Sequence, residues 1–257
     1  MDFLKFKNKY IITGELEVLN ALHIGSGKEE EEKDSPFISD DNGYYIPGSS
    51  FRGYLSTKLE RILGNDFKLK EKNDGDILNI ADVKLIFGYT NLDKEDEDIK
   101  NRVLKKLDCS ENSEEFNSMA GRIHISDMPI IKIKDDIVSI TRDGIKIDRE
   151  TGATEDKGKF NYDVIPAKSK FELCIELENI EKYQLELISL ALRDICSNGD
   201  LFGGNLSRGI GKCKIDIKNI EFVDSADKTL LKDYIFEGKL KKLDKKDFFK
   251  IRSLDLA

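Results

Sequence analysis

The sequence has few of the residues from which metal centres and disulfide frameworks are built. Its 257 residues include four cysteines and two histidines. The cysteines, Cys109, Cys174, Cys196 and Cys213, are scattered and form no C-x-x-C pair. Their spacing argues against a structural zinc site and against a disulfide framework, and it fits a reducing cytoplasm. Two histidines are also too few for a histidine-rich metal site.

Long apolar runs are missing too. No stretch approaches the ~20 apolar residues that a membrane span needs, and the N-terminal residues lack the apolar segment of a secretory signal. We therefore expect a cytoplasmic protein without membrane contact. Hydrophobic residues make up 39% of the chain and charged residues 36%. The usual values are ~45–50% and ~25%, but a chain of this length still buries a sizeable core, which excludes disorder throughout.

The charge balance is acidic, with 42 Lys and Arg residues against 50 Asp and Glu residues and a net charge of −8. This balance argues against non-specific nucleic-acid binding by the whole surface, but it allows a local basic groove. The run from Lys28 to Lys33 holds four consecutive glutamates, and such charge blocks are usually solvated, mobile loops.

Hydrophobic periodicity predicts an α+β fold. It predicts strands over 9–18, 121–127, 170–177 and 212–222, and helices over 51–63 and 184–195. Ser49 or Ser50 is suited to cap the first helix. The resulting order, β-α-β-β-α-β, is the pattern of the ferredoxin-like fold, in which two helices cover one face of an antiparallel sheet.

Three further segments lie outside this pattern. Residues 65–120 show weak periodicity and an acidic stretch, and they predict an insertion with its own short helices. Two alternating arms around a Gly- and Thr-rich tip over 141–166 predict a projecting β-hairpin. Residues 230–257 predict short helical elements that pack on the domain or contact a neighbour.

Two segments combine glycine with basic side chains. The helix entry 46–53 offers backbone N–H groups, small residues and Arg52 in the first turn, a combination that can hold a phosphate. The glycine cluster 203–211 lies where cations outnumber anions, which suits a phosphodiester strand. An ordinary capped helix and a tight hairpin are the structural alternatives. Between 199 and 218 the net charge is +2, from Arg208, Lys212, Lys214 and Lys218 against Asp200 and Asp216.

Asp34 is a lone carboxylate on a loop, directly before a Ser-Pro step. It could act as a general acid or base or hold a divalent cation near a phosphodiester, whereas many loop aspartates only shape a turn. His23 and His124 lie in apolar alternation, so we expect both to be half-buried with satisfied ring nitrogens. No Ser/His/Asp order or Walker-type loop is present, which argues against conventional hydrolases and NTPases.

Together these segments resemble the RAMP superfamily of CRISPR proteins, specifically the repeated backbone subunit of type III effector complexes. The resemblance spans roughly residues 9–222 and rests on Leu22–Gly25, Asp34–Ile38, Tyr45–Gly53, Arg142–Pro166 and Gly203–Gly211. It implies a single domain with a ferredoxin-like (RRM-like) palm, an inserted lid region and a β-hairpin thumb. The implied parts are a palm over 9–64, 121–134 and 167–222, an insertion over 65–120, a thumb over 135–166 and a C-terminal extension over 223–257.

The resemblance also implies partners. Such subunits stack head to tail on a CRISPR guide RNA, which pairs with the target RNA, beside other subunits of a type III effector complex. The guide would lie on the helix start, the glycine-rich loop and nearby cations, while the thumb would wedge between bases. The implied RNA-binding residues are Gly48, Ser49, Ser50, Arg52, Lys58, Gly203, Gly204, Arg208 and Lys212.

In the cleaving members of this family, an aspartate before the Ser-Pro step cuts the guide-complementary target RNA at regular intervals, and that position here is Asp34. The resemblance implies attack of a 2′-OH on the adjacent phosphate, assisted by Mg²⁺ or another divalent cation whose protein ligands are unknown. Some members lack cleavage activity, so a non-catalytic RNA-binding subunit is the first alternative. A guide-processing endoribonuclease, with His23 as its acid or base, is the second.

Overall fold

The computed structural model describes residues 5–27, 34–64, 67–69, 77–107, 117–131 and 139–256. The predicted acidic loop between Lys28 and Lys33 lies outside the described residues, as does Cys109. The described residues form a mixed α+β structure with antiparallel sheets. None of their helices has the length and apolar character to cross a membrane.

The main sheet has the strand order β11-β12-β1-β10-β6, and β13 pairs with the outer part of β12. Strand β1 is central because it pairs along its length with β10 on one side and with β12 on the other, both antiparallel. Its alternating residues Ile12, Leu16 and Val18 are fully buried on one face. The strands are β1 (Asn8–Val18), β6 (Ile123–Ile125), β10 (Lys170–Glu178), β11 (Asp200–Leu201), β12 (Lys212–Asp224) and β13 (Lys241–Lys242).

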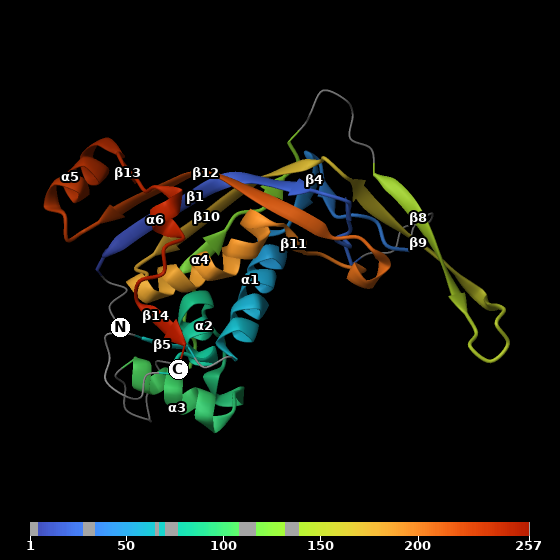
Figure 1. Cartoon of the computed structure of the whole chain (residues 1–257), viewed down its shortest axis with the longest axis horizontal. Coiled ribbons are helices and arrows are strands. Elements are labelled where there is room, and N and C mark those ends of the chain that lie inside the picture. Colours follow the sequence, from blue (N-terminus) through green and yellow to red (C-terminus); the bar gives the residue numbers. More distant parts are fainter. Residues whose placement is uncertain are drawn as a thin grey trace.

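Helices α1 (Gly48–Leu63) and α4 (Lys182–Ser197) cover one face of this sheet and contact each other (Figure 1). In α1 the fully buried residues Phe51, Leu55 and Leu59 are four positions apart, so a single stripe of the helix faces the core. Along the chain the elements follow the order β1, α1, β6, β10, α4 and β12, which is the predicted order.

The predicted start of α1 is wrong. The helix begins at Gly48, with Pro47 at the N-cap position, and neither Ser49 nor Ser50 caps it. The cap comes from elsewhere in the chain, because the Gly48 N–H donates to Oδ1 of Asp127 at 2.8 Å. A carboxylate at a helix N-terminus is also favoured by the helix dipole.

In the segment 65–120, predicted to be an insertion, the described residues form the short helices α2 (Ile80–Phe87) and α3 (Glu97–Lys106), and short helices are predicted there. A 3-10 turn at Leu92–Lys94 lies between them, and strand β5 (Phe67–Leu69) pairs with β14 (Leu254–Leu256) near the C-terminus. The fully buried Asp82 of α2 joins the insertion to the core. It accepts from Lys106 Nζ at 2.9 Å and from the Tyr183 hydroxyl of α4 at 3.1 Å.

The predicted hairpin consists of β8 (Ile140–Ile147) and β9 (Thr154–Pro166), and it projects from the body of the molecule (Figure 1). Its base is held by β2 (Ala21–Leu22), which pairs with the end of β9. A small sheet of β3 (Ser39–Asp40), β4 (Gly43–Ile46) and β7 (Met128–Pro129) leads into α1.

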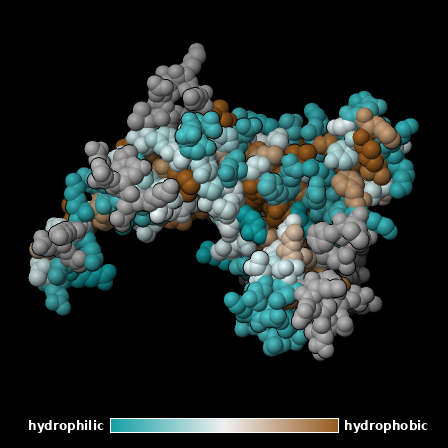
Figure 2. All heavy atoms as spheres, turned by 180° about the vertical axis from the view of Figure 1, so that it is seen from behind, coloured by the Kyte–Doolittle hydropathy of each residue, from teal (hydrophilic) through white to brown (hydrophobic). Residues whose placement is uncertain are grey.

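The C-terminal segment forms α5 (Lys228–Glu237) and α6 (Lys245–Phe248). Helix α5 lies at the opposite end of the molecule from the hairpin (Figure 1). Apolar side chains gather at this end in the space-filling view (Figure 2), where Ile235 and Phe236 are exposed by 62% and 76%.

Candidate functional site

Asp34 lies exposed on the loop between β2 and β3 and is tied to the hairpin strand β9. Its backbone N–H donates to Oδ1 of Asn161 at 2.9 Å. In return, the backbone N–H of Asn161 donates to Oδ2 of Asp34 at 2.7 Å. This reciprocal pair fixes both the backbone and one carboxylate oxygen of Asp34.

The residues after Asp34 continue along the same strand. Ser35 pairs with Tyr162 in a parallel bridge, and the Asp163 N–H donates to the Ser35 carbonyl at 3.0 Å. On its other side the loop pairs through Phe37 with Gly25. The loop that carries Asp34 is therefore held between the segment after β2 and the base of the hairpin.

His23 lies beneath this loop and is 5% exposed. Its Nδ1 lies 2.6 Å from the Asp163 carbonyl oxygen, so Nδ1 carries the proton and donates it. Nε2 then accepts from the Ser35 hydroxyl at 3.3 Å. The predicted satisfied histidine is confirmed for His23. It is wrong for His124, which is exposed on β6 because the strand alternation turns its side chain away from the core.

The glycine-rich loop packs directly on His23. Gly204 N–H donates to the His23 carbonyl at 2.8 Å. Gly203 has a φ of 96°, and a Cβ at this position would lie 2.7 Å from the same oxygen. Gly203 is therefore required for close packing of this loop against Leu22 and His23.

Arg208 extends from this loop over the hairpin. Its guanidinium carbon lies 4.5 Å from the centre of the Phe160 ring and 5.6 Å from that of Tyr162. Both rings flank Asn161 in the strand. The arrangement places an exposed cation on the strand that holds Asp34, fixed by cation–π contacts.

A cavity of about 860 Å³ lies between α1 and the glycine-rich loop. It is lined by the predicted RNA-binding residues Ser50, Lys58, Gly203 and Gly204, and by Gly25 beside the Asp34 loop. The structure thus brings the two segments singled out in the sequence to one cavity. Gly48, Ser49, Arg52, Arg208 and Lys212 are not among its lining residues.

The start of α1 differs from the simple phosphate cradle that the sequence predicts. The Gly48 N–H is occupied by Asp127, and the Ser50 N–H donates to the Pro47 carbonyl at 3.0 Å. The Arg52 guanidinium donates to the Phe87 carbonyl at the end of α2 and lies 5.8 Å from the Phe87 ring centre. Phosphate binding by these residues stays a prediction.

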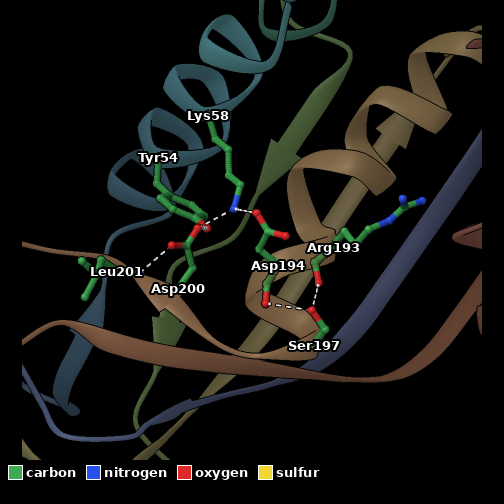
Figure 3. Close-up of polar contacts among 7 residues, drawn as sticks. All are labelled: Tyr54, Lys58, Arg193, Asp194, Ser197, Asp200 and Leu201. Carbon is green, nitrogen blue, oxygen red and sulfur yellow. Dashed lines mark hydrogen bonds and ion pairs between the residues drawn. The ribbon is translucent and has the colours of Figure 1, made fainter. Parts of the chain in front are cut away.

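Lys58 belongs to a polar cluster that joins α1, α4 and β11 (Figure 3). Its Nζ lies 2.8 Å from Oδ2 of Asp194 and is also paired with Asp200, which accepts from the Tyr54 hydroxyl at 2.7 Å. Its side chain is 14% exposed. A phosphate at Lys58 would compete with two carboxylates.

These contacts set the ionisation of the cluster. Burial favours the neutral acid, but the hydrogen bonds from Lys58 and Tyr54 outweigh it and hold the pKa of Asp200 below its ordinary value. Burial opposes the charge on Lys58, yet its bonds to Asp194 and Asp200 raise the pKa of its ammonium. At neutral pH, Lys58 and Asp200 are therefore both charged, and their ion pair links α1 to β11.

The described residues contain no group of three or more His, Cys, Asp or Glu side chains that could hold a metal ion. On β9, Asp163 is 2% exposed, and its carboxylate accepts from the Thr141 hydroxyl at 2.8 Å. Mg²⁺ commonly takes one or two carboxylates and fills its other positions with water and substrate phosphate. The described residues do not form a preformed cage for such an ion.

The part of the chain that contains this site matches a known protein family. A model described as the RAMP superfamily matches residues 15–214. The chain belongs to the RAMP superfamily. The matched range contains Asp34, Asn161, α1 and the glycine-rich loop, so the whole candidate site lies within the family's domain.

Two curated relatives of this RAMP chain have the same name, "CRISPR system Cms endoribonuclease Csm3". The protein from Methanocaldococcus jannaschii is 30% identical over 233 residues, which cover 86% of this chain and 84% of the relative. The protein from Methanothermobacter thermautotrophicus is 42% identical over 62 residues, which cover 22% of this chain and 25% of the relative. The first similarity extends over most of both chains.

Proposed function

We propose that this chain is a guide-RNA-binding backbone subunit of a type III CRISPR effector complex and cleaves target RNA through Asp34. The observation that carries this proposal is the carboxylate of the exposed Asp34, which Asn161 fixes on a loop that pairs through Phe37 with Gly25, a lining residue of the cavity. The name of the two Csm3 relatives supports an endoribonuclease. The complex would act in the cytoplasm. The partners of this chain would be the guide RNA, the target RNA, further copies of the chain stacked head to tail and other subunits of the complex.

The strand order supports a ferredoxin-like palm. With β1, β6, β10 and β12 taken as its first to fourth strands, the sheet runs fourth, first, third, second. Helices α1 and α4 then occupy the two helix positions of the pattern. In this proposal the insertion with α2 and α3 is the lid, and the β8–β9 hairpin is the thumb.

The guide RNA would lie in the cavity lined by Ser50 and Gly203. Arg208 would add a cation at the base of the thumb, and the strand start at Lys212 would add another. Backbone contacts of this kind fix position and carry no sequence information, so base pairing with the guide would select the target. Heterologous contacts between successive copies would extend the assembly along the guide.

The proposed reaction is transesterification within the target strand. The Asp34 carboxylate takes the proton of a 2′-hydroxyl, and the 2′-oxygen attacks the adjacent phosphorus. The bond from phosphorus to the 5′-oxygen breaks, and this oxygen takes a proton from water. The products are a 2′,3′-cyclic phosphate and a 5′-hydroxyl. Mg²⁺ or another divalent cation, if bound beside Asp34, would supply charge neutralisation at the phosphate.

The alternatives have less support. A guide-processing enzyme that uses His23 as its acid or base needs an accessible ring nitrogen, whereas Nδ1 and Nε2 are both hydrogen-bonded and the residue is buried. A non-catalytic subunit would leave Asp34 with a purely structural role. The pairing with Asn161 is compatible with such a role, so an experiment must separate the two.

The test is cleavage of a guide-complementary RNA by the reconstituted complex with magnesium. We expect Asp34→Ala to lower the cleavage rate by ~10²–10⁴-fold, the usual contribution of a general base, with unchanged target affinity. Asp41→Ala, on the exposed turn between β3 and β4, is the matched control and should cut at the wild-type intervals. Identical product ladders from wild type and Asp34→Ala would contradict the proposal, and binding without cleavage by either would favour the non-catalytic subunit.

A further inference from the structure

The two oxygens of the Asp34 carboxylate have different surroundings. Oδ2 accepts the backbone N–H of Asn161 at 2.7 Å. Among the described residues, the structure records no hydrogen bond to Oδ1. Oδ2 of this exposed residue is therefore anchored, whereas no described residue holds Oδ1.

The anchor depends on a side chain as well as on the backbone. Oδ1 of Asn161 accepts the backbone N–H of Asp34 at 2.9 Å, so the two residues are joined in both directions. Without that acceptor, the Asp34 N–H loses its bond to Asn161, and the loop stays paired with β9 at the next residue, Ser35, whose carbonyl accepts from Asp163. The carboxylate could then rotate away from the position set by the Asn161 N–H.

The anchor lies on the projecting hairpin. Asn161 and Tyr162 are consecutive residues of β9, and they contact Asp34 and Ser35 in the same order. The next residue, Asp163, accepts through its carbonyl from the buried His23. The carboxylate is thus positioned by the same strand that forms one arm of the hairpin.

We propose that Asn161 is a positioning residue. It holds the Asp34 carboxylate so that Oδ1 of Asp34 meets the reacting 2′-hydroxyl. The proposal rests on the proposed function of Asp34. A displacement of about 1 Å at a reacting group can cost ~10²-fold in rate, because the productive geometry is then rarely populated. Binding of the RNA does not depend on this orientation.

The experiment compares single-turnover cleavage and target binding in the reconstituted complex. We expect Asn161→Ala to lower the cleavage rate by roughly 10–100-fold and to leave the dissociation constant of the target within about twofold. Asn161→Asp keeps an oxygen at the acceptor position and should recover most of the rate. A general loss of folding would lower the cleavage rates of both variants together and would also weaken target binding.

Controls separate this inference from the function on which it rests. Asn219→Ala makes the same chemical change on the exposed bulge of β12 and should cleave as wild type does. If wild type cleaves, Asp34→Ala does not, and Asn161→Ala cleaves at the wild-type rate, only the positioning role is overturned. The same holds if Asn161→Asp is as slow as Asn161→Ala. If wild type and Asp34→Ala cleave alike, both proposals are overturned.

Discussion

At the scale of single residues, the hydrogen bonds around the carboxylate of Asp200 determine its pKa. It receives hydrogen bonds from Lys58, from the Tyr54 hydroxyl and from the Leu201 N–H. Because these bonds favour the ionised form, they hold its pKa below the ordinary value although burial acts in the opposite direction. A carboxylate of this kind stabilises the fold only while it is charged.

We expect Asp200→Asn to lower the free energy of unfolding by about 1 kcal/mol at neutral pH, the difference between charged and neutral hydrogen bonds. The contribution of Asp200 is present above the unfolded-state pKa of ~3.9 and is lost as the pH falls through the lower folded-state value. The difference between wild type and variant should therefore vanish in acid. Urea unfolding from pH 3 to 7 measures it, with Asp41→Asn as control. A difference independent of pH would contradict this assignment.

At the scale of elements, α1 contains two glycines with opposite surroundings. A Cβ at Gly48 would lie 2.0 Å from the Ile125 carbonyl oxygen, so α1 and β6 can approach only if this position has no side chain. A Cβ at Gly53, in the same helix, would meet no atom within 4 Å. Helix propensity alone favours alanine at both positions.

We therefore expect Gly48→Ala to destabilise the protein by about 1–3 kcal/mol, the usual cost of overpacking. Gly53→Ala should leave stability unchanged or raise it by up to about 1 kcal/mol. Thermal and urea unfolding of the two variants give a direct comparison within one helix. Equal effects would show that the contact between α1 and β6 does not limit stability.

The same elements show which features a sequence can predict. Hydrophobic periodicity is a local pattern, because it involves residues close together along the chain. The order and approximate bounds of β1, α1, β10, α4 and β12 therefore follow from the sequence alone. The cap of α1 does not, because its carboxylate comes from Asp127, far along the chain. Nor does the pairing of Asp34 with Asn161, which are 127 residues apart and share no local pattern. The pairing of Asp200 with Lys58 could not be predicted either, because the sequence shows Asp200 only as one anion among many.

At the scale of the whole molecule, the question is which cations are available to RNA in a chain of net charge −8. Several lysines on the open face of the main sheet are already paired. Lys170 Nζ lies 2.8 Å from Glu15, and Lys9 Nζ lies 2.6 Å from Glu176. Arg52 and Arg208 have no carboxylate partner among the described residues. A phosphate at these two arginines would neutralise positive charge that no carboxylate already offsets.

This difference predicts the salt dependence of guide binding. Each phosphate neutralised on a single strand contributes ~0.7 to the slope of log affinity against log salt, because bound counterions are released. We expect Arg208→Ala and Arg52→Ala each to reduce the slope by about 0.7 and to weaken binding equally for guides of different sequence. Lys170→Ala, which removes a paired cation, should change the slope little. The slope is measured from guide dissociation constants over a salt series. An unchanged slope for both arginine variants would show that neither arginine contacts a guide phosphate, and the predicted RNA-binding roles of Arg52 and Arg208 would be wrong.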